Sequence, residues 1–156
     1  MPMIDTPRLA AFVVRAKRQT YIGDGAHGPS CRPGTVDLPY AEGDLSYLDS
    51  YAGGADFLGQ ELVSHDGTPV WAMNYYGYLL RPDLITAESS GAVLKAALTR
   101  LYAQGRFLGG WEHRHEEHLY RDTNTGDVTH FEGREWIETD GVPSYELLYH
   151  GGLVRW

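Results

Sequence analysis

Residues 57–79 read FLGQELVSHDGTPVWAMNYYGYL and predict a β-hairpin. Two runs rich in β-branched and aromatic residues flank the dipeptide Asp66-Gly67, which is typical of two-residue hairpin turns. A hairpin of this kind implies an antiparallel sheet, because its strands pair directly rather than through a crossover helix. This segment therefore indicates an antiparallel architecture.

The register of this hairpin follows from the turn. A two-residue turn, or a four-residue loop, pairs odd-numbered residues of the first strand with even-numbered residues of the second, so Glu61 should share a face with Asn74 and Tyr76. That face mixes polar and apolar side chains, as the lining of a pocket does. The other face, with Trp71 and Met73, is more continuously apolar, and we expect it to pack against a helix.

Upstream of the hairpin, residues 44–51 alternate with a period of two, which predicts a strand with Tyr47 and Asp49 on one face. Residues 22–43 are rich in Gly, Pro, Asp and Ser and predict an ordered loop. We expect residues 23–44, which comprise most of this loop and the first residue of the strand, to help enclose the pocket. The strand and the loop thus bring carboxylates and aromatic rings to one side of the sheet.

Two helices are predicted from periodicity and caps. Over residues 6–18, Thr6-Pro7 is typical of an N-cap followed by proline at the first helical position. Over residues 88–104, apolar residues recur at helical spacing, and Gly105 lies just past the end. Each helix has one apolar stripe, so each should cover a sheet face.

The chain after the second helix predicts a β-meander. We see no internal repeat in the sequence. The order of elements indicates an α+β fold, with a curved antiparallel β-sheet of meander and hairpins packed against two main helices. We expect residues 1–156 to form a single ligand-binding-like domain. The predicted strands are 117–122, 127–132, 134–139 and 144–150, with a turn at residues 123–126.

The composition excludes several classes of function. A formal net charge of −8 argues against direct nucleic-acid binding, which needs a basic face. No apolar run is long enough to cross a membrane, and no signal peptide is evident, so we expect a cytoplasmic protein without membrane contact. The single cysteine, Cys31, allows no internal disulfide. We expect no cofactor, and a homodimer is compatible with the sequence.

The acidic residues are concentrated in one region. Between Arg32 and Arg81 there are seven carboxylates and no Lys or Arg, and six of the eleven tyrosines lie between residues 40 and 78. Aromatic walls with carboxylates can hold a cationic or amine ligand. Carboxyl groups in a poorly solvated pocket can instead have raised pKa values and transfer protons near neutral pH. The acids could also be solvated strand and turn residues.

Three functions therefore stay open. The first is a small-molecule-binding domain, in which Arg32 pairs with an acid or an anionic ligand group and Glu61 hydrogen-bonds the ligand. The second is a cofactor-free isomerase, cyclase or hydrolase, with Glu61 or Asp44 as base and a tyrosine or His150 as acid. The third is a partner-binding module with an acidic, aromatic surface. The candidate ligand-binding residues are Arg32, Asp37, Tyr40, Glu42, Tyr47, Trp71, Asn74 and Tyr76.

Two other motifs have competing interpretations. His113, His115 and His118 could ligate zinc, but their spacing fits no common zinc motif, so a charged surface loop is favoured and no metal is predicted. His150-Gly151-Gly152 could let the backbone approach a ligand, or it could only mark a turn near the C-terminus.

The region from Ser30 to Gly77 resembles a bacterial domain family of unknown function. That family occurs alone and also fused behind a helix-turn-helix in XRE-type transcriptional regulators, which implies a ligand-sensing role there. The histidine motif at residues 113–118 is not part of the resemblance. The matching residues are Arg32-Pro33-Gly34, Asp37-Leu38, Tyr40, Glu42-Gly43-Asp44, Tyr47, Asp49, Tyr51, Gly59, Glu61, Trp71, Met73 to Gly77, and His150-Gly151-Gly152.

Overall fold

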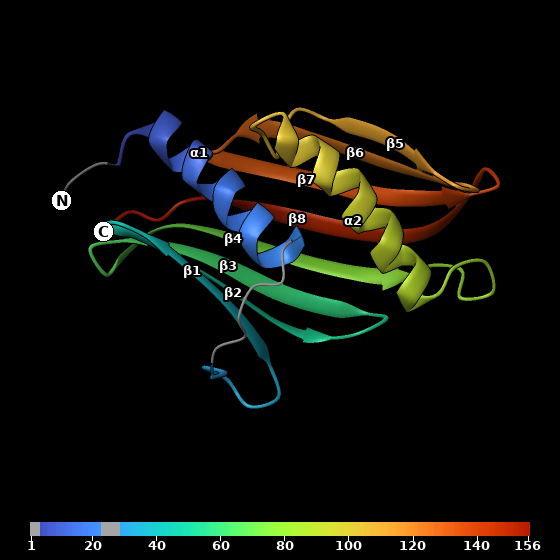
Figure 1. The fold of residues 1–156 in the computed structure, drawn as a ribbon, viewed down its shortest axis with the longest axis horizontal. Coiled ribbons are helices and arrows are strands. Elements are labelled where there is room, and N and C mark those ends of the chain that lie inside the picture. The colour runs from blue at the N-terminus through green and yellow to red at the C-terminus, as the bar shows by residue number, and fades with distance from the viewer. Residues whose placement is uncertain (1–3, 23–28) are drawn as a thin grey trace.

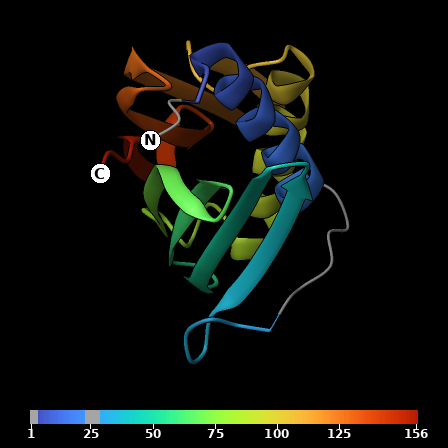
Figure 2. The same cartoon turned by 90° about the vertical axis from the view of Figure 1, so that its left-hand side faces the viewer.

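One antiparallel sheet of eight strands curves around two helices in the computed structural model, which describes residues 4–22 and 29–156 (Figure 1). The strand order is β1-β2-β3-β4-β8-β7-β6-β5, and both helices lie on the concave face (Figure 2). The predicted α+β class with a curved antiparallel sheet is thus confirmed. The strands are β1 Val36–Glu42, β2 Leu45–Gly53, β3 Phe57–His65, β4 Thr68–Leu79, β5 Trp111–His115, β6 His118–Asp127, β7 His130–Thr139 and β8 Val142–Leu153.

The first helix, α1 (Thr6–Lys17), forms where the sequence predicts it and continues as a π-helical turn, η1 (Arg18–Ile22). Its N-cap is Asp5 rather than Thr6, because the Asp5 carboxylate accepts a hydrogen bond from the backbone N–H of Arg8 at 3.0 Å. The apolar stripe of the helix is fully buried against the sheet.

The second helix, α2 (Ala87–Ala103), lies within one residue of the prediction. The side chains of Thr86 and Ser89 each bond the backbone N–H of the other, which forms a capping box. Gly105, two residues past the helix, has a φ of 76°, a conformation that favours glycine. Within the described ranges, no helix is long and apolar enough to cross a membrane.

The predicted hairpin forms, but its predicted register is wrong. The turn pairs His65 with Thr68 as expected, yet a β-bulge follows, so Ser64 pairs with Pro69 while Val63 pairs with Trp71. Proline has no N–H to donate to the ladder, and the bulge lies beside it.

The bulge moves every later residue of β4 to the opposite face. Glu61 therefore pairs with Met73, and Asn74 pairs with Gln60. Asn74 and Tyr76 lie on the convex face, away from Glu61.

The second half of the sheet also departs from the prediction. Residues 123–126, predicted as a turn, continue β6 and pair with β7, and the turn comes after Asp127. The predicted break at Gly133 is absent, since β7 runs through this glycine without interruption. The prediction also missed β5, which pairs with the start of β6.

The two halves of the chain repeat one arrangement, so the expectation of no internal repeat is wrong. Each half has a helix followed by four strands, and the sheet order is symmetric about the junction of β4 and β8. The turn Asp66-Gly67 recurs as Asp140-Gly141, with positive φ at all four residues. The bulge after Val63 likewise recurs between Ile137 and Glu138.

The sequence repeat is faint but in register. Pro69 and Pro143 occupy the same place in the two hairpins, as do Gly59 and Gly133, and each pair is 74 positions apart. Between β2 and β6 the offset is 73, because the segment between the equivalent pairs is one residue longer in the second half, with three residues between Gly53 and Phe57 and four between Gly126 and Phe131. The duplication matters because it places related side chains on both flanks of the concave face.

Candidate functional site

A cavity of about 540 Å³ lies between the two helices and the concave face of the sheet. This volume is within the usual range for small-molecule sites. Its lining is exposed at Tyr21 of η1, at Gly53 and Gly54 where β2 ends, and at Ala87 and Gly91 in the first turns of α2. The end of β2 and the start of α2 lie together at one end of the molecule (Figure 1), so the cavity opens there.

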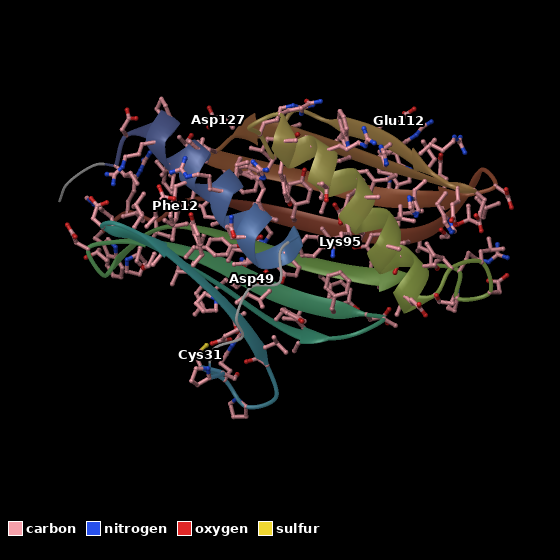
Figure 3. All side chains as sticks on the ribbon, viewed as in Figure 1. Phe12, Cys31, Asp49, Lys95, Glu112 and Asp127 are labelled. Carbon is pink, nitrogen blue, oxygen red and sulfur yellow. The ribbon has the colours of Figure 1, made fainter. Side chains whose placement is uncertain are left out.

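One group of polar residues in the cavity, the first half-site, consists of Tyr47, Asp49, Glu61, Tyr75 and Lys17. Asp49 and Glu61 are direct cross-strand neighbours on β2 and β3, only 5% and 4% exposed. Asp49 lies on the side of the sheet that faces α1 (Figure 3). The carboxylate of Glu61 accepts hydrogen bonds from the Lys17 ammonium at 2.9 Å and from the Tyr47 hydroxyl. Tyr75 donates its hydroxyl proton to Asp49 Oδ1 at 2.7 Å.

The second half-site repeats this arrangement with Tyr120, Asp122, Glu135 and Tyr149. Asp122 and Glu135 are cross-strand neighbours on β6 and β7, and they are 5% and 8% exposed. Tyr120 donates to Glu135 at 2.6 Å and Tyr149 donates to Asp122 at 2.7 Å. The second oxygen of Glu135 accepts from the Tyr145 hydroxyl at 3.2 Å. Where the first half-site has an ammonium group, the second thus has a neutral hydroxyl.

A glycine makes each tyrosine–aspartate bond possible. Tyr75 on β4 reaches across Gly59 on β3 to Asp49 on β2, and a Cβ at Gly59 would lie 2.2 Å from the Tyr75 hydroxyl. Tyr149 crosses Gly133 in the same way, and a Cβ there would lie 2.2 Å from its ring. Only glycine leaves room for a ring lying flat over the neighbouring strand.

Burial shifts the acid–base properties of these carboxyl groups. Loss of hydration, together with the neighbouring Glu61 charge, raises the pKa of Asp49 to about 7. Burial raises the pKa of Asp122 to about 6 and that of Glu135 to about 7. Burial also holds the pKa of the Tyr120 hydroxyl well above 10, so this group stays a hydrogen-bond donor at neutral pH. Three carboxyls in the cavity therefore exchange protons near neutrality.

Each half-site leaves one oxygen atom open. Both oxygens of Glu61 and both of Glu135 accept hydrogen bonds. Asp49 and Asp122 each use Oδ1, and no described residue donates to Oδ2 of either. Both aspartates line the cavity, so these Oδ2 atoms are acceptors available to a bound molecule.

Replacing Glu135 with Gln should stabilise the protein increasingly, relative to the unchanged chain, as the pH rises from about 5 to about 8. The pKa of buried Glu135 is raised to about 7, whereas an unfolded chain titrates glutamate at about 4.3. Between these values the folded state holds a proton that the unfolded state has released, so rising pH destabilises the unchanged protein. Glutamine does not ionise and escapes this loss.

Urea denaturation across this pH range measures the difference in the free energy of unfolding. Glu132→Gln, on the exposed face of the same strand, is the matched control. A difference for Glu135→Gln that stays constant or falls with pH would contradict the raised pKa.

The structure places only two of the sequence-predicted site residues in the cavity, Glu61 and Tyr47. Asn74, Tyr76 and His150 lie on the convex face, where all three are exposed and Asn74 pairs with His150 across β4 and β8. The bulge explains why Asn74 and Tyr76 are separated from Glu61, because it reverses the faces of β4 from Trp71 onward. The predicted convergence of Glu61, Asn74 and Tyr76 does not occur.

Other candidates form networks outside the cavity. Trp71 is fully buried in the core and donates its indole N–H to the Val128 carbonyl at 2.9 Å. Asp44 lies in the β1–β2 turn and pairs with Arg8 and with His65, the latter at 2.9 Å.

Tyr40 and Glu42 form a network on the outside of the protein. Tyr40 donates to the Glu42 carboxylate at 2.7 Å, and Arg15 donates to the same carboxylate at 3.0 Å. This ion pair is nearly half exposed, so it contributes little to stability.

Arg32 and Asp37 also lie apart from the cavity. Asp37 faces away from it on β1, where its Oδ2 accepts from the Cys31 backbone N–H at 2.9 Å. Arg32 donates to the Ser50 hydroxyl at 3.2 Å, and a hydrogen bond from Ser50 lowers the pKa of Asp37. Of the loop expected to enclose the cavity, residues 23–28 lie outside the described part, and residues 36–42 are strand β1.

The predicted histidine motif forms the β5–β6 hairpin. His115 pairs with His118 across a two-residue turn, and the buried His118 ring bonds the Thr139 hydroxyl at 2.8 Å. Over the described ranges, one cluster has three possible metal ligands close enough together, Asp44 with His65 and Asp66, and it already pairs with Arg8. The histidine motif is not such a cluster.

Sequence reasoning missed the whole second half-site, and in the first half-site it missed Tyr75 and Lys17 and did not single out Asp49. A signal was present, since Tyr-x-Asp occurs at Tyr47 and again at Tyr120, and Gly-x-Glu occurs at Gly59 and again at Gly133. These short patterns carry meaning only once the strands that contain them are known to be equivalent. Lys17 gave no such signal, because a basic residue at the end of a helix is ordinary.

Comparison with known proteins yields one finding. Residues 49–154 match the model of a protein family described as a domain of unknown function (DUF5680). The matched stretch contains all of the second half-site and begins at Asp49 of the first. No curated protein matches the chain, and no solved structure does.

Proposed function

We propose, for a chain that belongs to the DUF5680 family of domains of unknown function, that the cavity binds a small organic cation with an apolar body. The observation that carries this proposal is a charge imbalance inside the cavity. Among the described lining residues, four carboxylates face one cation, Lys17. A positively charged ligand would relieve this imbalance.

The cost of burying these carboxylates supports a cationic ligand. Charged groups out of water must be paired, or they take up protons instead. The raised pKa values of Asp49, Asp122 and Glu135 show that without a ligand these groups partly take up protons. A bound cation would take the place of those protons, so binding should strengthen as the pH rises past about 7.

The rest of the cavity supports an apolar body on the ligand. Leu94, Leu98 and Leu101 of α2 line it, together with Phe57 and Phe107. Such walls bury hydrocarbon favourably, and aromatic faces also attract cations. We therefore expect alkylamines or arylalkylamines rather than small inorganic ions.

2-Phenylethylamine should raise the melting temperature of the protein, whereas 2-phenylethanol and 3-phenylpropanoate should not. At about one hundred times Kd a ligand stabilises the folded state by about 2.7 kcal/mol, which corresponds to about 5–10 °C for a chain of this size. Thermal shift at pH 8 detects this difference, and isothermal titration calorimetry gives Kd. Equal shifts with the alcohol, or a larger shift with the carboxylate, would overturn the proposal.

The proposed binding has a further use in sensing. Domains that this chain resembles lie behind a helix-turn-helix in XRE-type regulators, where occupancy of a pocket would be the signal. For this chain, a bacterial origin, a cytoplasmic location and a homodimer remain parts of the same proposal.

A cofactor-free acid–base enzyme is the second candidate. It is favoured by the pKa values of Asp49 and Glu135, both raised to about 7. A carboxyl group whose pKa is close to the working pH can take up a proton and return it. To separate the two candidates, 2-phenylethylamine is incubated with the protein in D2O, recovered and examined by NMR. Recovery of the unchanged amine, with no deuterium bound to carbon, supports binding alone. Deuterium incorporation at carbon would support catalysis.

A further inference from the structure

The two half-sites are equivalent in all but one partner. Glu61 and Glu135 occupy the same place in the repeat, and each accepts a tyrosine hydroxyl from the strand beside it. The remaining oxygen of Glu61 accepts from the Lys17 ammonium, whereas that of Glu135 accepts from the Tyr145 hydroxyl. The place of Tyr145 is taken in the first half by Trp71, which donates elsewhere.

This difference concentrates the negative charge of the cavity in the second half-site. In the first, Lys17 supplies one positive charge to two carboxylates, and its side chain is 6% exposed. In the second, every described donor to Asp122 and Glu135 is a neutral tyrosine hydroxyl. Among the described residues, a cation is therefore in direct contact with one flank and not with the other, where the charges of Lys17 and Arg106 act on Asp122 only at longer range.

The surroundings of the Lys17 ammonium indicate what the second half-site can hold. Lys17 Nζ lies 2.9 Å from Glu61 Oε2 and 3.5 Å from the Met73 sulfur. The repeat places Leu147 where Met73 lies, and both Leu147 and Glu135 line the cavity. An ammonium group bound beside Glu135 would thus meet a carboxylate and an apolar floor.

An open acceptor lies beside this place. Asp122 is 5% exposed and lines the cavity, and its Oδ2 has no donor among the residues that the structure describes. This oxygen is not among the fully buried atoms without a partner, so an N–H donor of a molecule in the cavity can reach it, and a charged donor makes the stronger bond.

We propose that the ammonium group of the ligand lies in the second half-site, where it donates to Asp122 Oδ2 and pairs with Glu135, as Lys17 pairs with Glu61 in the first half-site. The inference rests on the proposed function and narrows the ligand to an amine that carries an N–H when protonated. A quaternary ammonium ion has the same charge but no N–H to donate. The N,N,N-trimethyl derivative of 2-phenylethylamine should therefore bind about tenfold or more weakly than the amine itself.

The duplication supplies a matched pair of variants. Asp122→Asn should weaken binding of 2-phenylethylamine by about 10- to 100-fold, because a charge-assisted hydrogen bond is lost while the Tyr149 bond can persist. Asp49→Asn removes the equivalent charge from the flank that Lys17 already neutralises, so its loss should be no more than about threefold. Calorimetry at pH 8 measures both values, and circular dichroism checks folding.

Chemical rescue tests whether a free amine can replace the Lys17 ammonium group in the first half-site, as the likeness of the two half-sites implies. Lys17→Met empties the first half-site of its ammonium group, so propylamine should raise the melting temperature of this variant more than that of the unchanged protein. Lys95→Met, the exposed lysine of α2, should respond to propylamine as the unchanged protein does.

The outcomes separate the inference from the proposed function. If the unchanged protein does not distinguish the amine from the alcohol and the carboxylate, the proposed function fails. If it does, but Asp49→Asn weakens binding as much as Asp122→Asn, or the trimethyl derivative binds as well as the amine, the placement in the second half-site is wrong. A Lys17→Met variant that propylamine stabilises no more than the unchanged protein would also overturn it.

Discussion

Replacing Lys17 with Met should lower the free energy of unfolding by about 3–5 kcal/mol. The ammonium group lies 2.9 Å from the Glu61 carboxylate, and the two side chains are 6% and 5% exposed. Removing one partner of such a buried pair leaves the other charge without compensation in a poorly solvated place. Urea denaturation at neutral pH measures the loss.

The chain has a matched control for this experiment, because its only other lysine is Lys95. Lys95 is exposed on α2, so Lys95→Met should change stability by no more than about 0.5 kcal/mol. The double variant Lys17→Met with Glu61→Gln should recover part of the loss, since neither residue is then charged. A loss below about 1 kcal/mol for Lys17→Met would show that the pair does not stabilise the fold as its burial implies.

Replacing Gly133 with Ala should cost about 3–5 kcal/mol through two effects. The new Cβ would lie 2.2 Å from Cζ and 2.3 Å from the hydroxyl oxygen of Tyr149, so the ring must move. Its movement would break the 2.7 Å bond to Asp122 and leave a buried carboxyl without a donor. Gly59→Ala should have a similar effect through Tyr75 and Asp49, because the duplication repeats the same crossing.

The control for the glycine variants is Gly54→Ala, where a Cβ meets open space and φ is not in the left-handed region. That change should stay within about 0.5 kcal/mol. Adding Tyr149→Val to Gly133→Ala removes the obstructing ring, so the two changes together should cost less than the sum of each alone. Additive losses would mean that the ring does not lie flat over the glycine as the structure shows.

Local features of the chain were predictable because their causes lie within a few residues. The capping residues and apolar spacing of α2 identify it within one residue, and Asp66-Gly67 identifies its turn. The same holds for Tyr47 and Asp49, which alternation places on one face and which do face the cavity. Backbone geometry and side-chain periodicity suffice for these features.

The site itself was predicted only in part. Glu61 and Tyr47 were identified, but on a face that was expected to carry Asn74 and Tyr76 as well. One extra residue in β4, beside Pro69, reverses the faces of the rest of that strand. Periodicity assumes an unbroken alternation, so it cannot register such an insertion.

The sequence by itself determined the two helices, the hairpin turn at Asp66-Gly67, the α+β class and the concentration of acids and tyrosines before α2. Only the tertiary structure decided which of those acids share a cavity. Lys17 meets Glu61 across 44 residues, and Asp49 and Asp122 come from strands on opposite flanks of one sheet. Sheet curvature and the symmetric strand order bring these groups together, and both arise from pairing between distant strands. Local preferences end within a turn of helix or a hairpin, whereas the charge balance of a cavity depends on every element that encloses it.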